Sequence, residues 1–140
     1  MEFDTLKLEN QLCFPLYSAS REVVKKYRPY LSEIGLTYTQ YITMMVMWEE
    51  KEITVKELGE KLFLDSGTMT PVLKSLEKKS LVARNRSEID ERSVIVKITE
   101  KGEELKEIAK EIPLKIASCV GLMPEEAKEL YQLLYKILGR

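Results

Sequence analysis

Residues 54–99 read TVKELGEKLFLDSGTMTPVLKSLEKKSLVARNRSEIDERSVIVKIT, and this stretch decides the fold. Its first half contains two short helical segments, each preceded by residues that favour a helix N-cap. Thr54 and Glu57 have the spacing of a capping box, and Asp65 or Ser66 caps the second segment. Apolar residues recur at helical spacing in both segments: Val55, Leu58 and Leu62 in the first, and Met69, Val72, Leu73 and Leu76 in the second.

The second half of this stretch changes period. From Leu81 the apolar residues alternate, so VARNR (82–86) and SVIVKIT (93–99) are expected to be strands, joined by the polar turn SEIDE (87–91). Two short capped helices followed at once by a hairpin are typical of a winged helix-turn-helix. In that motif the second helix enters the major groove of DNA and the hairpin lies along the backbone.

Two helices are expected before this unit. Proline is accepted in a first helical turn but discourages helical geometry in the residue before it. The first helix is therefore predicted from Phe14–Pro15 to the Arg28–Pro29 step, which puts Cys13 at its N-terminal edge. Thr37 and Gln40 form a second capping box, which opens the strongly apolar run YITMMVMWEE, expected to be a central buried helix.

Two further helices are expected after the hairpin. Thr99 caps one that is bent or interrupted at Pro113, and the last follows Pro124. Both ends of the chain carry more apolar surface than a small DNA-binding core can cover, which indicates a twofold dimer. The predicted fold is one mainly α (α+β) domain over 1–140. Its winged helix core spans about 37–99, and N- and C-terminal dimerisation helices (about 1–36 and 100–140) flank this core.

The composition narrows the class of protein. The chain has 140 residues, 44% of them hydrophobic, which is enough for one core. No window approaches the roughly 20 apolar residues of a membrane helix. The acidic start MEFDTLKLENQ lacks the pattern of a signal peptide, so a cytoplasmic location without membrane contact is expected.

Cysteine and histidine content limit the chemistry. The chain has two cysteines and no histidine, which excludes a histidine-containing zinc site and serine–histidine or cysteine–histidine catalysis. Cys13 and Cys119 are far apart in sequence and form no CxxC motif, so a structural disulfide framework is not expected. We therefore expect no metal, no cofactor and no enzymatic activity.

Charge is distributed unevenly along the chain. Residues 66–86 contain five basic residues and one glutamate, which gives a local charge of +4. Because the net charge of the chain is −1, the remaining residues together carry a charge of −5. A basic patch on an acidic body favours a nucleic-acid partner, namely double-stranded operator DNA. The residues expected to contact DNA are Ser66, Thr68, Thr70 and Lys74 on the second short helix, and Arg84, Arg86 and Arg92 on the hairpin.

These polar residues have a simpler explanation as well. Serine and threonine favour helix caps for local reasons, and a charged face on a small α+β domain is usually only solvated. The complete order of elements together with the local charge favours DNA binding over this alternative.

The wing of the chain resembles that of the MarR-type transcriptional regulators, through Asp90-Glu91-Arg92 and Ile98-Thr99. The similarity extends to one branch of that family, the organic hydroperoxide resistance regulators. It is carried by four stretches and covers the chain up to about Pro113. These stretches are LENQLCFPLY (8–17), YRPYL (27–31), GLTYTQY (35–41) and LGEKLFLDSGTMTPVLKSLEKKSLVARNRSEIDERSV (58–94).

The resemblance implies a redox-sensing repressor, active as a homodimer, that releases its operator when an organic hydroperoxide oxidises Cys13. It also implies that Tyr17, Tyr27 and Tyr38 match tyrosines whose hydroxyls bond the reactive sulfur. From the residues alone, a thiol at a helix N-terminus meets the positive end of the helix dipole, which favours the thiolate. The resemblance also makes Cys119 a candidate resolving thiol, with a low-molecular-weight thiol as the other candidate. From the residues alone, Cys119 is equally an ordinary buried cysteine.

Three rival functions are considered. A regulator of the same fold could sense a small aromatic ligand in a cavity between the dimer and DNA-binding parts. A thiol peroxidase would also use a reactive cysteine, but the chain has no thioredoxin-like βαβ pattern. A protein-interaction adaptor could keep the fold without binding DNA, and the basic segment argues against it.

Overall fold

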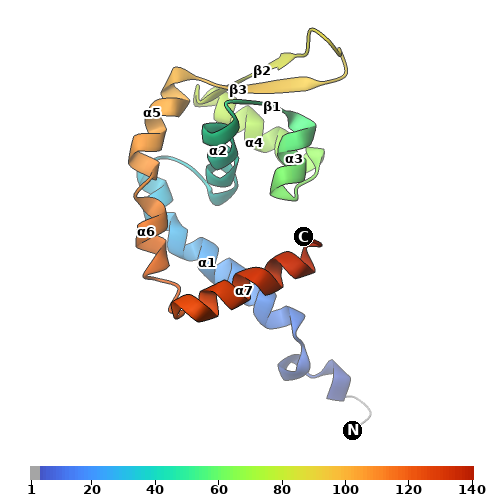
Figure 1. Cartoon of the computed structure of the whole chain (residues 1–140), viewed down its shortest axis with the longest axis vertical. Coiled ribbons are helices and arrows are strands. Elements are labelled where there is room, and N and C mark those ends of the chain that lie inside the picture. The colour runs from blue at the N-terminus through green and yellow to red at the C-terminus, as the bar shows by residue number, and fades with distance from the viewer. Residues whose placement is uncertain (1–3) are drawn as a thin grey trace.

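The chain folds as a winged helix with long helices at both ends (Figure 1). This computed structural model describes residues 4–140; Met1–Phe3, the start of the predicted N-terminal dimerisation segment, lie outside the described residues. Two 3-10 turns, Asp4–Leu6 and Leu8–Asn10, precede the first helix. The elements are then α1 (Cys13–Glu33), α2 (Tyr38–Glu50), β1 (Glu52–Thr54), α3 (Val55–Leu62), α4 (Ser66–Lys78), β2 (Val82–Arg86), β3 (Val94–Ile98), α5 (Glu100–Ala109), α6 (Ile112–Ala117) and α7 (Pro124–Ile137).

The two helices of the helix-turn-helix are α3 and α4, and their N-caps confirm the predicted starts. Thr54 Oγ1 accepts the backbone N–H of Glu57 at 3.1 Å. Asp65, rather than Ser66, caps α4: its Oδ1 accepts the N–H of Thr68 at 2.8 Å. That backbone bond holds the pKa of the Asp65 carboxyl below its ordinary value.

The wing is confirmed as an antiparallel hairpin, but it belongs to a larger sheet than expected. β2 pairs with β3, with Val82 opposite Ile98 and Arg86 opposite Val94. A third strand, β1, pairs with the other edge of β3, so the order is β1-β3-β2. Only three residues long, β1 was missed because it is too short to show an alternating pattern. It buries Ile53 opposite Val96 at the base of the wing.

One predicted helix boundary was wrong, and one predicted interruption lies a few residues earlier than expected. Pro29 lies inside α1, which continues to Glu33, because Leu31 is buried and Tyr27 and Tyr30 pack on the core beside the proline. Packing therefore outweighs the loss of one backbone hydrogen bond. After the wing, α5 already ends at Ala109, and Pro113 lies in the first turn of α6, where its missing N–H costs nothing.

The core is built around α2, as its apolar sequence predicted. Met44 and Met47 of α2 are fully buried and belong to one cluster with Leu58, Leu73 and residues of the sheet. Trp48 Nε1 donates to the carbonyl of Gly102 at 2.8 Å, which ties α2 to α5. Within residues 4–140 no helix combines the length and the apolar character that a membrane crossing requires.

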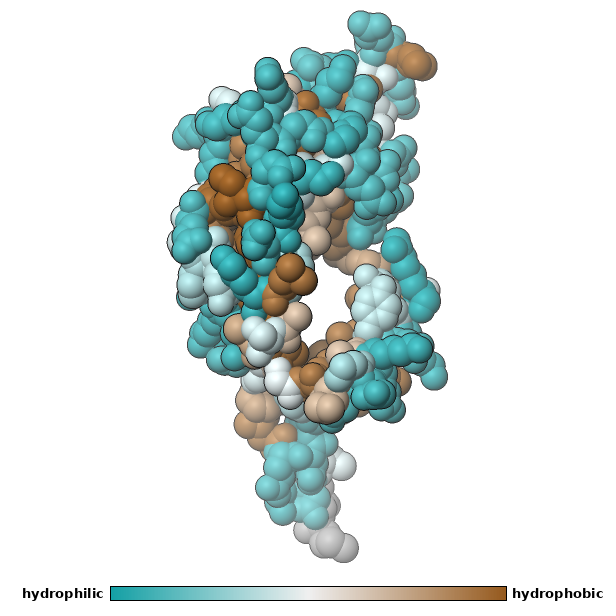
Figure 2. All heavy atoms as spheres, turned by 60° about the vertical axis from the view of Figure 1, so that its left-hand side comes forward, coloured by the Kyte–Doolittle hydropathy of each residue, from teal (hydrophilic) through white to brown (hydrophobic). Residues whose placement is uncertain are grey.

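α6 continues from α5 and packs against α1 with Ile112 and Ile116 buried, and α7 then turns away from it (Figure 1). None of the residues of α7 is buried within the single chain, although its sequence is strongly amphipathic. Figure 2 shows an opening through the molecule with apolar side chains on its rim. Leu130, Tyr131, Leu133 and Ile137 of α7 are all exposed.

Gly102 provides a test of this packing. A Cβ there would overlap the carbonyl oxygen of Leu81 and lie 2.8 Å from a side-chain carbon of Ile98. Gly102→Ala should lower the free energy of unfolding by about 1–3 kcal/mol, since α5 must move away from the wing base. Chemical denaturation measures this value. Lys101→Ala, an exposed neighbour on the same helix, is the control, and equal stabilities of the two variants would contradict the close approach.

Candidate functional site

The predicted recognition helix, α4, presents the expected polar face. Ser66, Thr68, Thr70 and Lys74 are all exposed, whereas Met69, Leu73 and Leu76 on the opposite side are buried. The hydroxyl of Thr70 donates to the carbonyl of Ser66 at 2.8 Å, which leaves its oxygen free to accept. The helix N-terminus and its hydroxyls are therefore open to solvent, as contact with phosphates or base edges requires.

Arg84 has a different environment from the other predicted DNA contacts. Its Nε and Nη2 donate to Glu77 Oε1 at 3.1 and 3.0 Å, and its backbone N–H donates to Glu77 Oε2 at 3.3 Å. The Arg84 side chain is only 23% exposed. This geometry favours a structural role, in which Arg84 joins the base of the wing to α4. Glu77 is the only acidic residue of the basic patch, but four other basic residues lie in the same stretch, so the sequence did not identify Arg84 as its partner.

Arg86 and Arg92 lie on the exposed outer part of the wing. Arg86 Nη1 donates to the carbonyl of Glu91 at 3.3 Å. The Asp90 carboxylate accepts the backbone N–H of Arg92 at 3.0 Å and the hydroxyl of Ser93 at 3.4 Å. Asp90 thus shapes the turn through the backbone. The Arg92 guanidinium forms no ion pair with any residue between 4 and 140, so it is available to a ligand outside the chain.

Cys13 is the first residue of α1, and its side chain is an exposed free thiol. No side chain caps this helix end, so its first N–H groups have no partner within the helix, and the thiol lies at the positive end of the helix dipole. Pro15 fits in the first turn without breaking the helix. Tyr17 follows one turn later on the same face of the helix and is exposed. The Cζ atom of Arg21 lies 5.5 Å from the centroid of its ring.

Tyr27 and Tyr38 lie in a half-buried aromatic cluster at the other end of α1. Their ring centroids are 5.0 Å apart in an edge-on arrangement, and Tyr41 lies 5.8 Å from Tyr27. Burial, with a smaller effect from Tyr38 and Tyr41, raises the pKa of Tyr27 to about 12, and burial also raises the pKa of Tyr38. Both hydroxyls stay protonated at neutral pH and can donate hydrogen bonds.

The structure does not bring these two tyrosines to Cys13 of the same chain. Cys13 and Tyr27 are 14 residues apart on one continuous helix, which corresponds to about 21 Å at the α-helical rise. Of the predicted sensor residues, only Tyr17 is within one turn of the thiol.

Cys119 follows α6 and packs against the C-terminal half of α1. Its Sγ donates to the carbonyl of Lys115 at 3.3 Å. A hydrogen bond with Cys119 raises the pKa of the Tyr30 phenol, and Lys115 Nζ lies 5.4 Å from the Tyr30 ring centroid. Tyr30 was not among the predicted site residues. Cys119 is a half-buried free thiol, and its neighbour Tyr30 is about 25 Å along α1 from Cys13.

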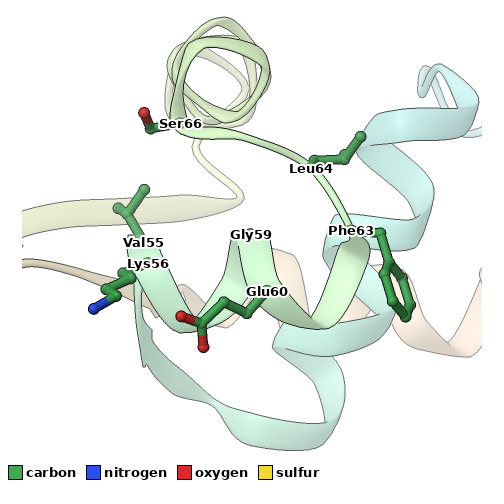
Figure 3. Close-up of a pocket in the computed structure, with 7 residues that line it drawn as sticks. All are labelled: Val55, Lys56, Gly59, Glu60, Phe63, Leu64 and Ser66. Atoms are coloured by element: carbon green, nitrogen blue, oxygen red, sulfur yellow. The ribbon is translucent and has the colours of Figure 1, made fainter. Parts of the chain in front are cut away.

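A pocket opens on the helix-turn-helix between α3 and the start of α4 (Figure 3). Val55 and Phe63 lie at its two ends, and no predicted sensor residue lines it. The pocket is open to solvent, unlike the enclosed and mainly apolar cavities that bind small ligands. The lining residues are Val55, Lys56, Gly59, Glu60, Phe63, Leu64 and Ser66.

A helix-turn-helix formed by α3 and α4, a wing that carries arginines and a long N-terminal helix together define a winged helix transcriptional regulator. A family model described as "Transcriptional regulator SarA/Rot" matches residues 25–108. The organic hydroperoxide resistance transcriptional regulator of Bacillus subtilis (strain 168) is 49% identical over 137 residues, 98% of this chain and 93% of that protein. The chain belongs to the organic hydroperoxide resistance regulators of the MarR family.

Solved structures agree with this assignment. Reduced AbfR bound to DNA is 36% identical, with a TM-score of 0.81 over 99% of this chain and 97% of that one. AbfR comes from Staphylococcus epidermidis. Its other structures include an overoxidized form bound to DNA (TM-score 0.79) and a disulfide-formed state (0.67). A MarR mutant from E. coli complexed with operator DNA is 25% identical, with a TM-score of 0.82 over 91% of this chain and 93% of that one.

The raised pKa of Tyr27 predicts a loss of stability at alkaline pH. The folded state favours the neutral phenol, so this contribution is intact below about pH 10 and is lost as the pH rises through about 12. Tyr27→Phe should therefore make the free energy of unfolding less dependent on pH between these values, as measured by denaturation at a series of pH values. Glu88→Gln, at an exposed wing residue that carries no phenol, should leave the wild-type dependence unchanged. Identical pH profiles for Tyr27→Phe and the wild type would contradict the burial effect.

Proposed function

We propose that this chain is a dimeric repressor that binds operator DNA and releases it when an organic hydroperoxide oxidises Cys13. The observation that carries this proposal is the exposed thiol at the first position of α1, in a chain whose α4 and wing offer an open DNA-binding face. The relatives support it: one is described as an organic hydroperoxide resistance regulator, and AbfR has DNA-bound structures in reduced and overoxidized forms.

DNA binding is assigned to α4 and to the outer wing. The N-terminal face of α4, with Ser66, Thr68, Thr70 and Lys74, would enter the major groove. Arg86 and Arg92 would follow the backbone or enter the adjacent minor groove, whereas Arg84 stays with Glu77. A twofold dimer then presents two such helices to a near-palindromic operator.

Dimerisation explains the apolar surface that a single chain leaves exposed. It is concentrated in the segments assigned to dimerisation, and the MarR-family regulators are dimers. The exposed residues are Leu6, Leu8, Leu12, Phe14 and Leu16 at the N-terminal end, and Leu130, Tyr131, Leu133, Ile137 and Leu138 in the α7 region.

The dimer would also complete the sensor. Because Cys13 and the pair Tyr27–Tyr38 lie at opposite ends of α1, one chain cannot bring them together. Two α1 helices related by a twofold axis and running antiparallel would place the thiol of one protomer beside Tyr27 of the partner subunit. The tyrosine hydroxyls would then donate to the sulfur and stabilise its thiolate.

The chemical step is a two-electron oxidation of sulfur. The Cys13 thiolate attacks the terminal oxygen of the hydroperoxide, the O–O bond breaks, and the alcohol leaves with a proton while sulfur becomes a sulfenic acid. A second thiol then displaces water to form a disulfide. This thiol would be a low-molecular-weight thiol or Cys119 of the partner subunit, since Cys119 of the same chain lies at the far end of α1.

The function is tested by substituting the two cysteines. Cys13→Ser should keep DNA affinity within about threefold of the wild type, because serine is nearly isosteric and surface changes are small. It should also abolish release by cumene hydroperoxide. Cys119→Ser should still release DNA but recover more slowly on reduction if Cys119 resolves the sulfenic acid. A Cys13→Ser protein that leaves DNA on peroxide treatment would overturn the mechanism.

The assignment of the wing is tested at Arg92. Arg92→Ala should weaken binding to the DNA upstream of the protein's own coding sequence by about 1–3 kcal/mol, with unchanged thermal stability. Fluorescence anisotropy measures this affinity. Arg28→Ala removes an exposed arginine from α1, outside the winged helix, and should have little effect. If the two variants bind equally well, Arg92 is not a DNA contact.

A further inference from the structure

Gln40 connects the turn between α1 and α2 to the recognition helix. It is the third residue of α2, and only 8% of its surface is exposed. Its Oε1 accepts the backbone N–H of Thr37 at 3.1 Å and Lys79 Nζ at 2.9 Å, and its Nε2 donates to Ser75 Oγ at 2.8 Å. One buried amide therefore connects the first turn of α2 to the C-terminal end of α4.

Lys79 strengthens the same connection from the end of α4. Besides Gln40, its ammonium donates to the carbonyl of Gly35. Gly35 lies in the α1–α2 turn with φ +69°, a left-handed conformation that glycine adopts without strain. The last turn of α4 thus holds the α1–α2 turn at two points, one on each side of the cap residue Thr37.

The sensor tyrosine Tyr38 lies in the same first turn of α2. Its ring packs edge-on against Tyr27 of α1, while Gln40, two residues later, bonds to α4. A displacement of Tyr38 would move the capping box, because Thr37 and Gln40 bond to each other as well. The partners Ser75 and Lys79 would then have to follow or lose their bonds.

Stability alone does not require this arrangement. Met69, Leu73 and Leu76 already bury the inner side of α4 completely, in one core with α2. An apolar residue at position 40 would fill the same space without needing three partners. Polar contacts differ from apolar ones in having a fixed geometry, so they transmit a displacement rather than adapt to it.

We propose that Gln40, Ser75 and Lys79 form a positioning unit that couples the oxidation state of the sensor to the placement of α4. The inference rests on the proposed function, since it assumes that Tyr38 responds to Cys13. In the reduced protein the buried apolar side of α4 keeps it in its DNA-binding position, and the unit joins α4 to the α1–α2 turn. After oxidation it transfers the movement of the α1–α2 turn to α4, and the operator is released.

The test compares the loss of DNA affinity on oxidation in Ser75→Ala and Lys79→Met with that in the wild-type dimer. The probes are cumene hydroperoxide and a DNA fragment from upstream of the protein's own coding sequence. Reduced Ser75→Ala should bind within about threefold of the wild type. Reduced Lys79→Met should bind as tightly as reduced Lys78→Met, which loses the same charge from the basic patch. The ratio of oxidised to reduced dissociation constants should fall by about fivefold or more, because the link between the sites is cut. The rate of Cys13 oxidation, followed by mass spectrometry, should not change.

Lys78→Met is the matched control. Lys78 is exposed, lies beside Lys79 at the same end of α4, and loses the same charge. Any effect of charge on DNA binding should appear in both oxidation states of this variant, so its ratio should equal that of the wild type.

The outcomes are distinct. A wild-type dimer that ignores peroxide refutes the proposed function itself. If the wild type responds and the Ser75 and Lys79 variants keep its ratio, the coupling role is wrong. The role is also wrong if both variants unfold, lose affinity equally in both states, or oxidise more slowly at Cys13. Unfolding or an equal loss of affinity would mean that the Gln40 contacts only stabilise the fold. Slower oxidation would mean that they affect the reactivity of Cys13.

Discussion

The length and continuity of α1 constrain the rest of the protein. A single helix from Cys13 to Glu33 carries the thiol at one end and Tyr27, in contact with Tyr38, near the other. An α-helix cannot fold back on itself, so thiol and tyrosines remain separated in every conformation that keeps α1 intact. If the tyrosines activate the sulfur, oxidation of Cys13 requires the dimer. A monomer would then react slowly with peroxide, and it could not contact both halves of an operator.

The distribution of apolar surface agrees with this constraint. The winged helix completes its own core around α2, whereas α7 has no buried residue within the single chain. The residues on either side of Cys13, Leu12 and Phe14, are also exposed apolar residues in the single chain. Oxidation of Cys13 would therefore place a larger, polar group beside an apolar contact, which is costly to accommodate unless the surrounding helices shift.

Much of the fold was predictable because its signals are local. The caps Thr37, Thr54 and Thr99 each bond to the expected backbone N–H, and the alternating pattern identified both strands of the wing. The errors came from non-local effects. Packing of Leu31 carries α1 through Pro29, and β1 exists only because β3 offers it an edge.

The site was predictable to a smaller extent. The sequence placed Cys13 at a helix start and the recognition face on α4, because both follow from helical position. It could not show that Arg84 is held by Glu77, or that Gln40 does more than cap α2. Both depend on which segments the tertiary fold brings together. Arg84 and Glu77 are 7 residues apart in sequence, and Gln40 and Lys79 are 39 residues apart.

The Arg84–Glu77 pair has a consequence for how such a protein searches a genome. Affinity for random DNA comes almost wholly from cations that displace counterions from phosphates, and a guanidinium already bound to a carboxylate displaces fewer. Glu77 would thus lower the cationic charge available for DNA without contacting Ser66, Thr68, Thr70 and Lys74, the residues proposed to contact it. Residence on unrelated sequences would then be shorter, and a dimer released from its operator by oxidation would dissociate faster from the neighbouring DNA.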